Sequence, residues 1–361
     1  MALPNKIASL FDIELPIIQA PMAGSSGIEM ALSVSKIGGL GSLACATMDV
    51  EQLETHLLEM KGKTTKPFNV NFFAHEEFNV DHEHNDKWLS LLKPYYNELH
   101  QEAPQELTAG FIKSFDEDRC SVLEKICPRV VSFHFGLPHQ RLIKRLKDAG
   151  MKIISTATTV EEACWLESRG CDAIIAQGYE AGGHRGMFLS KNTHTQIGTM
   201  SLVPQIVDAV DIPVIAAGGI ADPRGVAAAF ILGASAVQVG TAYLHTKEST
   251  ISPIYRASLK SATAHDTCLS NVFSGRPTRC RMNRFIREHG PISDKSPQFP
   301  LGFSAMSALR IEGEQQGKRD FSPHYCGQSV AMKSSESATQ LTRDLALKAR
   351  SLLKGFATDH D

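Results

Sequence analysis

The sequence predicts an α/β protein: a (β/α)8 TIM barrel with a smaller, lid-like second domain at the C-terminal mouth of the barrel. Short, nearly continuous apolar runs alternate with longer amphipathic stretches over the first 245 residues, as expected for parallel strands buried on both faces. No G-x-G-x-x-G pattern follows the first run, which argues against an open dinucleotide-binding sheet. Eight strands are expected, over residues 16–22, 40–47, 67–74, 129–135, 151–158, 171–178, 212–219 and 234–241.

Helical patterns fill the intervals between the expected strands. Asp49 suits the N-cap of a helix over 49–63, and Pro223 suits the first turn of a helix over 222–233. Glycine, a common helix stop, ends two further expected helices. These two cover residues 138–150 and 159–170.

Two stretches break the alternation of strands and helices. Residues 75–110 form a polar insertion after the third strand, and residues 246–330 contain the glycine- and arginine-rich run SGRPTRCRMNRF. Both follow the C-terminal ends of strands, where barrel active sites are built. We therefore expect a barrel over 1–245, a second domain over 246–330 and a C-terminal helix over 331–361 that returns to the barrel.

Composition excludes several classes of partner. The chain has 361 residues with 37 basic and 39 acidic side chains, a net charge of −2 and no basic run, so we expect no nucleic-acid partner. No apolar run reaches the roughly 20 residues that cross a bilayer, and the first 21 residues lack a secretion-signal pattern. The eight cysteines form no CxxC pair. We expect reduced thiols, a cytoplasmic location and no metal site.

Small residues end the last two expected strands. Gly218 and Gly219 follow one, while Gly240 and Thr241 close the other. In barrels this position commonly binds a phosphate, because backbone N–H groups converge there beside a helix N-terminus. The same glycines could instead only close tight turns between strand and helix.

Amide side chains interrupt several of the apolar strands. A buried amide must be hydrogen-bonded, so a single one is usually a satisfied core group. Several near strand C-termini suggest a ring of donors and acceptors around a heterocycle, for which a flavin is a good match and a nicotinamide or purine a less specific one. The amides are Gln19, Asn69, Asn71, Gln177 and Gln238.

Two histidines fall at the same mouth. His134 ends the fourth strand in SFHFG, and His184 lies in the glycine-rich run QGYEAGGHRG after the sixth. Histidine titrates near neutral pH, so it can accept a proton or hold an anion. His134 could equally be a buried strand residue, whereas the glycines around His184 favour a functional role.

Two other polar groups remain open at this stage. His82 and His84 have the spacing of one strand face and could form a metal pair, but a solvated insertion explains them as well. Four arginines could clamp a phosphate or form a hydrated charged face. They are Arg276, Arg279, Arg281 and Arg284.

Taken in order, these segments resemble the class I nitronate monooxygenases, formerly called 2-nitropropane dioxygenases. The resemblance covers nearly the whole chain and is highly specific as a set. The matching segments are PIIQAPMAG, GGLGSL, FNVNFF, SFHFG, AQGYEAGGHRG, IPVIAAGGIADPRG, VQVGTAYL, SGRPTRCRMNRF and YCGQS.

The resemblance implies an FMN-dependent enzyme that oxidises alkyl nitronates, such as propionate 3-nitronate, with O2 to a carbonyl compound and nitrite. His184 matches the family's catalytic histidine, and His134 matches a second active-site histidine. An imidazole beside the flavin could hold the nitro oxygens of the anion, or could abstract the α-proton of a neutral nitroalkane. The implied FMN-binding residues are Ala20, Pro21, Met22, Asn71, Gln177, Gly182, Gly183, Gly218, Gly219, Gln238, Val239, Gly240 and Thr241.

Two alternatives stay open from the sequence. An NAD(P)H-dependent flavin reductase of the same barrel type, such as an enoyl-acyl-carrier-protein reductase, shares the GGH loop and the phosphate segments, and fold and cofactor do not fix the substrate. A non-enzymatic flavin or phosphate-ligand sensor is the other. The expected partners are a small nitronate and O2, with a homodimer as the assembly considered. The physiological nitronate is not determined by the sequence.

Overall fold

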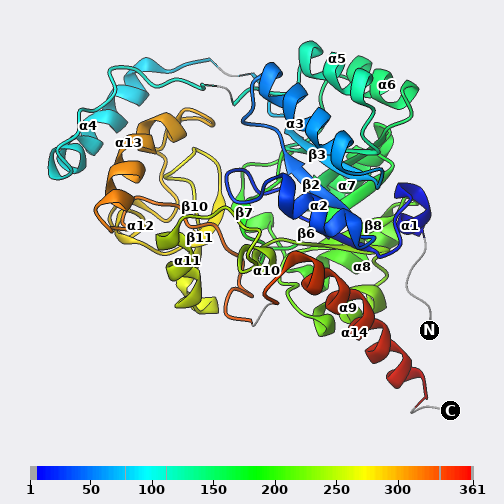
Figure 1. Ribbon diagram of the computed structural model, residues 1–361. Coiled ribbons are helices and arrows are strands. Elements are labelled where there is room, and N and C mark those ends of the chain that lie inside the picture. The colour runs from blue at the N-terminus through cyan, green and yellow to red at the C-terminus, as the bar shows by residue number, and fades with distance from the viewer. Residues whose placement is uncertain (1–5, 78, 111, 333–334, 359–361) are drawn as a thin grey trace.

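The computed structural model describes residues 6–77, 79–110, 112–332 and 335–358 of the chain. Residues 333, 334 and 359–361 of the expected C-terminal segment lie outside the described residues. Figure 1 shows a barrel of strands ringed by helices, with a group of helices and a small sheet at one end of it. In the described part, no helix is both long and apolar enough to cross a membrane.

Eight parallel strands form the barrel, as predicted. The sheet runs β1-β9-β8-β6-β5-β4-β3-β2, and a parallel bridge from Ile18 to Leu40 joins its first strand to the start of its last. Each strand falls inside the range expected for it, because long buried apolar runs are a strong local signal. The strands are β1 Ile17–Gln19, β2 Gly41–Ala44, β3 Phe68–Phe73, β4 Val130–His134, β5 Lys152–Ala157, β6 Ala173–Gln177, β8 Val214–Ala217 and β9 Ala236–Val239.

The helices around the barrel begin and end at the signals that the sequence carries. Asp49 caps α3 through the backbone N–H of Gln52, and Asp222 caps α9, whose first residue is Pro223. These helices, with the C-terminal α14, are α1 Lys6–Phe11, α2 Ile28–Lys36, α3 Val50–Lys63, α5 Glu117–Ile126, α6 Gln140–Asp148, α7 Val160–Ser168, α8 Thr199–Ala209, α9 Pro223–Ile231, α10 Thr241–Leu244 and α14 Ala338–Thr358.

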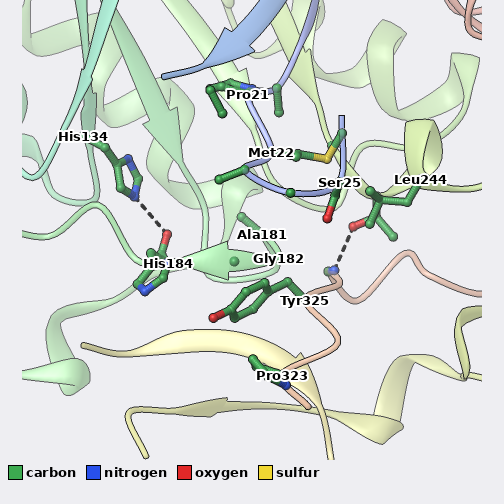
Figure 2. A pocket seen from close by; sticks show the side chains of 18 of the residues that line it. Pro21, Met22, Ser25, His134, Ala181, Gly182, His184, Leu244, Pro323 and Tyr325 are labelled. Atoms are coloured by element: carbon green, nitrogen blue, oxygen red, sulfur yellow. Dashed lines mark hydrogen bonds between the residues drawn. The ribbon is translucent and has the colours of Figure 1, made fainter. Parts of the chain in front are cut away.

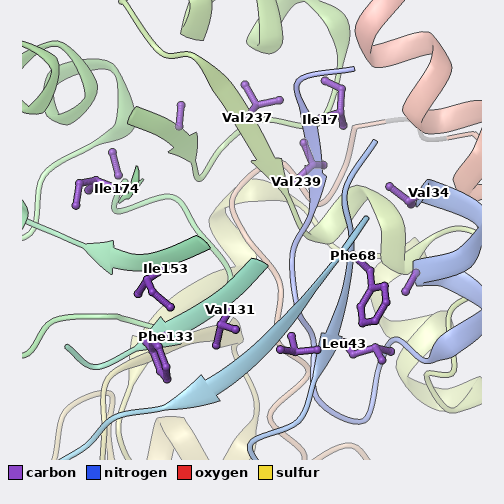
Figure 3. Close-up of a cluster of buried hydrophobic side chains, with 14 of the residues drawn as sticks. Ile17, Val34, Leu43, Phe68, Val131, Phe133, Ile153, Ile174, Val237 and Val239 are labelled. Carbon is purple, nitrogen blue, oxygen red and sulfur yellow. The ribbon is translucent and has the colours of Figure 1, made fainter. Parts of the chain in front are cut away.

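Two buried clusters hold the barrel together. The larger lies between strands and helices; Figure 3 shows Val131, Ile153 and Val237 among its members. The other fills the barrel interior, where Ile154 and Ile175 pack with Phe11 of α1. This interior cluster supports the mouth of the barrel from below.

A third cluster builds the end of the molecule beyond the strand tips. Trp88 and Leu92 of α4 pack with Phe285 and Phe321, so the insertion and the later segment share one core, and α4 lies beside α13 in Figure 1. We call residues 82–107 and 267–325 the mouth unit. Its elements are α4 His82–Glu98, β10 Thr267–Ser270, β11 Thr278–Arg281, α12 Arg284–His289 and α13 Gly302–Gln315, next to α11 Pro253–Lys260; the short 3₁₀ helices are Thr193–Thr195 and Ala264–Asp266.

The structure corrects the strand interpretation of His82 and His84. Both lie in the first turn of α4, where residues two apart do not face each other. The His84 ring instead contacts the carbonyl of Ser296, at 3.2 Å from Nε2. The two side chains are therefore not arranged as the metal pair considered from the sequence.

Three short strands, β7, β10 and β11, lie outside the eight expected ranges, and β7 matters for the site. β7, Gly183–His184, leaves the barrel and pairs antiparallel with β11, with His184 opposite Thr278. β11 in turn pairs with β10. The glycine-rich loop thereby joins the barrel to the sheet of the mouth unit.

Candidate active site

A cavity of about 500 Å³ lies between the strand tips and the mouth unit, a size typical of ligand pockets. Apart from Val239, every site residue predicted from the sequence lines it, and Figure 2 shows several of them around one space. The Val239 side chain is buried in the core between strands and helices, while its carbonyl accepts the Ala20 N–H at 2.8 Å. The lining residues predicted are Ala20, Pro21, Met22, Asn71, His134, Gln177, Gly182, Gly183, His184, Gly218, Gly219, Gln238, Gly240 and Thr241.

The glycines of the loop after β6 allow close backbone contact. A Cβ on Gly182 would lie 2.5 Å from backbone atoms of both Cys326 and Gly327, far inside van der Waals contact. Gly183 has a φ of +77°, a conformation that other residues rarely adopt. The loop can therefore pass directly against the backbone of Cys326 and Gly327, in the segment that closes the cavity.

Two buried arginines fix the shape of this loop. The Arg185 guanidinium donates to the carbonyls of Gln177 at 2.7 Å and Gly178 at 2.6 Å. Arg279 donates from Nε to the Tyr179 carbonyl at 3.0 Å and lies over the Tyr179 ring. These hydrogen bonds from two buried side chains hold a glycine-rich segment in one conformation.

Gln177 uses both ends of its amide to position the same loop. Its Nε2 donates to the His184 carbonyl at 2.9 Å, and its Oε1 accepts the Gly186 N–H at 2.8 Å. The amide is therefore engaged within the protein, and only the remaining surface of the side chain is left for a ligand.

His184 stands in an aromatic environment within the cavity. Its Nε2 lies 2.9 Å from the hydroxyl of Ser274, and the ring centroids of Phe303 and Tyr325 are both 5.7 Å away. Burial, with smaller electrostatic effects of His134 and Arg276, lowers the pKa of His184 to about 3. The imidazole is therefore neutral at physiological pH, and Nδ1 has no hydrogen-bond partner among the described residues.

Ser274 offers the imidazole two hydrogen-bonding arrangements. Its hydroxyl lies 2.9 Å from His184 Nε2 and 3.3 Å from the Arg276 carbonyl, and it carries only one proton. If the hydroxyl donates to Nε2, the ring proton resides on Nδ1. If it donates to the carbonyl, Nε2 keeps the ring proton and Nδ1 is a free acceptor.

His134 has no free nitrogen. Its Nε2 lies 3.1 Å from the His184 carbonyl, which can only accept, so Nε2 carries the proton. Nδ1 then accepts the hydroxyl of Thr156 at 3.1 Å. Burial lowers the pKa of His134 to about 4, and Figure 2 shows the ring directed at the backbone of His184. This geometry is that of a neutral side chain that orients the His184 loop.

The strand amides divide into two groups. Asn69 donates to the hydroxyls of Ser42 and Ser132, and Gln19 accepts the Ser42 N–H, all away from the cavity. Both amides belong to the core, although the Oδ1 of Asn69 has no hydrogen-bond partner among the described residues. Asn71 and Gln238 line the cavity instead. The Oε1 of Gln238 is buried without a hydrogen-bond partner among the described residues, which is costly unless a ligand donates to it.

The tips of β8 and β9 form the other end of the cavity. Gly218 and Gly219 both have positive φ, +109° and +71°. The Gly327 N–H donates to the Thr241 hydroxyl at 2.9 Å, and the Ser329 hydroxyl donates to the Gly219 carbonyl at 2.5 Å. The segment YCGQS thus closes over the strand tips where the sequence predicts a phosphate site.

Sequence reasoning assigned no role to two residues that contact this site. Ser274 lies in the SGRPTR run and Tyr325 in YCGQS, and both runs carried only the family resemblance. The Tyr325 ring lines the cavity, and its hydroxyl is buried without a partner among the described residues. Burial raises its pKa, so the phenol keeps its proton and is a free donor.

The sequence suggested that the four arginines at 276, 279, 281 and 284 clamp a phosphate or form a hydrated charged face, and most of them do neither. Arg279 is 2% exposed, and Arg276 lies over the Phe135 ring and donates to the Met187 carbonyl at 2.9 Å. Arg281 donates to Ser258 and Ser261. Only Arg284 belongs to a charged surface, with Glu98 and Glu288, and none of the four lines the cavity.

Known proteins resemble this chain over almost its full length. The model of the family described as nitronate monooxygenase matches residues 5–348. The nitronate monooxygenase of Pseudomonas aeruginosa is 40% identical over 96% of this chain and 99% of its own, and a Staphylococcus aureus protein named "Probable nitronate monooxygenase" is 39% identical over 94% and 96%.

Solved structures extend the comparison to the fold. A nitroalkane oxidase from Streptomyces ansochromogenes superposes with a TM-score of 0.88 at 35% identity, covering 97% of this chain and 99% of the other. FabK from Thermotoga maritima is more distant, with a TM-score of 0.71 at 27% identity and 99% of each chain covered. The cavity therefore occupies the mouth of a shared barrel fold, and this chain belongs to the nitronate monooxygenase family of flavin-dependent oxidoreductases.

Proposed function

We propose that this chain oxidises alkyl nitronates with bound FMN and O2 to a carbonyl compound and nitrite. The observation that carries the proposal is His184: a neutral imidazole with a free Nδ1, held in a cavity of ligand size. Membership of the nitronate monooxygenase family supplies the reaction class. Propionate 3-nitronate is the substrate to test first.

The residues of the cavity fit FMN. The unpartnered Oε1 of Gln238 needs a donor, which a flavin or its ribityl chain supplies. Asn71 would contact the same ring system, and Gly182 and Gly183 let the loop approach it closely. Gly218, Gly219, Gly240 and Thr241, at the tips of β8 and β9, would take the phosphate. Bound FMN would supply the redox chemistry by accepting an electron from the nitronate, after which O2 reacts further.

Ser274 lets His184 serve two forms of substrate. With an anionic nitronate, the Ser274 hydroxyl donates to Nε2, and the proton on Nδ1 hydrogen-bonds a nitro oxygen. With a neutral nitroalkane, Ser274 donates to the Arg276 carbonyl, and Nδ1 accepts the α-proton. Because the pKa of His184 is only about 3, proton abstraction is the harder task, and we expect nitronates to be the better substrates.

Three further groups orient the substrate and exclude water. The free hydroxyl of Tyr325 would donate to a second nitro oxygen. The rings of Phe73 and Phe303 line the cavity 6.3 Å and 5.7 Å from the His184 ring and form an apolar wall. Beside this apolar wall, an anionic nitronate interacts more strongly with the hydrogen-bond donors of the cavity than it would in water.

The test uses the purified protein as it is isolated. We expect visible flavin absorbance, release of FMN on denaturation, and nitrite formation from propionate 3-nitronate in the presence of O2. Protein without flavin absorbance, or flavoprotein that forms no nitrite, would refute the proposal.

A flavin reductase is the second candidate, since FabK from Thermotoga maritima shares the fold. Its lower identity, 27% against 40% for the Pseudomonas aeruginosa enzyme, favours the nitronate reaction. Rapid mixing with NADH under anaerobic conditions separates the two: a reductase bleaches its flavin without nitronate, and the proposed enzyme does not. If neither the nitronate nor NADH supports turnover, the result would instead favour a non-enzymatic flavin or phosphate-ligand sensor. A homodimer and a cytoplasmic location remain predictions, for light scattering and cell fractionation.

A further inference from the structure

Two cysteines face each other across the small sheet of the mouth unit. Cys268 of β10 is the register partner of Cys280 of β11. Cα atoms of directly opposed residues in antiparallel strands lie about 4.5–5.5 Å apart, within the range of about 4.4–6.8 Å that a disulfide spans. Both thiols are free, and each alters the pKa of the other. The backbone therefore already presents a disulfide-compatible pair.

The two thiols differ in accessibility and in acidity. Cys280 is fully buried, whereas Cys268 is partly exposed. The hydrogen bond from Cys280 lowers the pKa of Cys268 against the opposing effect of burial, and the nearby Arg279 charge also lowers it. The pKa of Cys280 is raised well above its ordinary value by the same hydrogen bond and by burial. Cys268 is thus the thiol that reacts first, with Cys280 next to it.

In the described strand pairs, no other cysteine lies opposite a cysteine. Cys127 and Cys164 are exposed, but their Sγ atoms hydrogen-bond to the carbonyls of Glu124 and Ala209. Cys45 and Cys171 are buried, and burial raises the pKa of both thiols. The remaining two are Cys120 and Cys326, both buried.

We propose that Cys268 and Cys280 form a redox modification site that takes hydrogen peroxide as its oxidant. The Cys268 thiolate attacks one peroxide oxygen, the O–O bond breaks, and the released hydroxide takes up a proton to become water. The Cys280 thiol then attacks the Cys268 sulfenic sulfur, the S–O bond breaks, and its oxygen leaves as a second water. Two thiols and one peroxide give one disulfide and two waters, so the two sulfurs are oxidised and both peroxide oxygens are reduced.

The pair lies on the strand that holds the active-site loop. Two residues before Cys280, Thr278 is the register partner of His184, and Cys280 itself forms a bridge with Tyr325. A disulfide cross-links β10 to β11 at this point, which restricts the movement of β11 and of both segments that contact it. Oxidation therefore lowers turnover reversibly.

The test treats the holoenzyme with hydrogen peroxide and then removes the excess. We expect the free-thiol count to fall by two, the mass to fall by two hydrogens, and a proteolytic digest to contain residues 268 and 280 in one disulfide-linked pair. Dithiothreitol should restore both thiols and turnover. A pair linked through other cysteines, or no loss of thiols, would overturn the proposal.

Matched variants separate the site from general oxidation. Cys268→Ser changes a partly exposed thiol, and Cys164→Ser changes an exposed thiol on α7. We expect peroxide to leave turnover of Cys268→Ser unchanged and to lower that of Cys164→Ser at least fivefold, as in the wild type. Equal sensitivity of the two variants would refute the coupling to the active site. The thiol and mass readouts do not depend on nitronate turnover, so failure of the proposed function would show separately.

Discussion

The barrel and the mouth unit contribute different things to one cavity. The barrel supplies backbone at glycine-rich strand tips and the buried Oε1 of Gln238, which we propose as the groups that hold FMN. The mouth unit supplies side chains: the Ser274 hydroxyl, the Tyr325 phenol and the ring of Phe303. His184 belongs to both, since β7 leaves the barrel and pairs with β11. The difference predicts that substitutions in the barrel weaken FMN binding, whereas substitutions in the mouth unit lower turnover.

The largest effect is expected at the junction of the two regions. Among the described residues that line the cavity, His184 has the only free imidazole nitrogen. His184→Asn removes it but leaves the backbone of β7 intact, so flavin should be retained. We expect nitrite formation per bound flavin to fall by about 10²–10⁴-fold, the range for loss of a group that transfers or holds a proton. Steady-state nitrite assays normalised to flavin absorbance measure it. Turnover within threefold of the wild type would remove His184 from the mechanism.

The second effect tests the barrel side of the comparison. Gly182→Ala places a Cβ 2.5 Å from backbone of Cys326 and Gly327, so the closing segment must shift. We expect a loss of about 1–3 kcal/mol in the free energy of unfolding, as for other overpacked sites, together with loss of bound flavin. Chemical denaturation and the flavin-to-protein absorbance ratio report the two.

Gly62→Ala is the control for that substitution. Gly62 lies in α3 with nothing within 4 Å of a built Cβ, and alanine favours helix by about 0.5–1 kcal/mol. It should keep its flavin and gain slightly in stability. Full flavin occupancy and wild-type stability in Gly182→Ala would contradict the close backbone contact.

A smaller effect should appear as pH dependence of stability. Burial lowers the pKa of His134 to about 4, so below about 6.5 the unfolded chain binds the proton more readily than the folded one. The contribution of neutral His134 to the free energy of unfolding is therefore fully present above pH 6.5. It is lost as the pH falls toward 4, and the loss is on the order of 2–3 kcal/mol. His134→Gln keeps a donor for the His184 carbonyl but does not titrate. Its unfolding free energy should fall less steeply over this window, and an unchanged slope would contradict the neutral assignment.

The smallest of these effects concerns the proton on His184. Ser274→Ala removes the hydroxyl beside Nε2, and we expect nitrite turnover to fall about tenfold, or about 1.4 kcal/mol, with flavin retained. Ser270→Ala, a buried serine on β10 without contact to the histidine, should turn over like the wild type. Equal turnover of both variants would remove Ser274 from the positioning of the imidazole.

The same division explains what the sequence could predict. Barrel strands, caps such as Asp49 and the glycines that line the cavity at the ends of β8 and β9 follow from local patterns: apolar runs, N-cap residues and paired small residues. The mouth unit does not, because α4 finds its partners Phe285 and Phe321 some 190 residues or more along the chain, and no local period encodes that contact.

Individual residues show the same limit. Arg279 looks like a surface charge in the sequence, but its side chain is buried. Its guanidinium lies over the Tyr179 ring and donates a hydrogen bond to the Tyr179 carbonyl. Ser274 and Tyr325 are single polar residues in irregular segments, and only the fold reveals that both meet His184. Val239 was assigned to the site from its motif, yet strand alternation turns its side chain into the core.

The measurement that tests the comparison most directly pairs one variant from each region. Gln238→Leu removes the unpartnered barrel amide, and Tyr325→Phe removes the unpartnered hydroxyl, so each deletes one polar contact in the same cavity. Dissociation constants for FMN and nitrite turnover at saturating FMN are measured on both. We expect Gln238→Leu to weaken FMN about tenfold with turnover within twofold of the wild type, and Tyr325→Phe to show the reverse. Weakened FMN binding in Tyr325→Phe with normal turnover would contradict the division between a cofactor-binding barrel and a substrate-facing mouth.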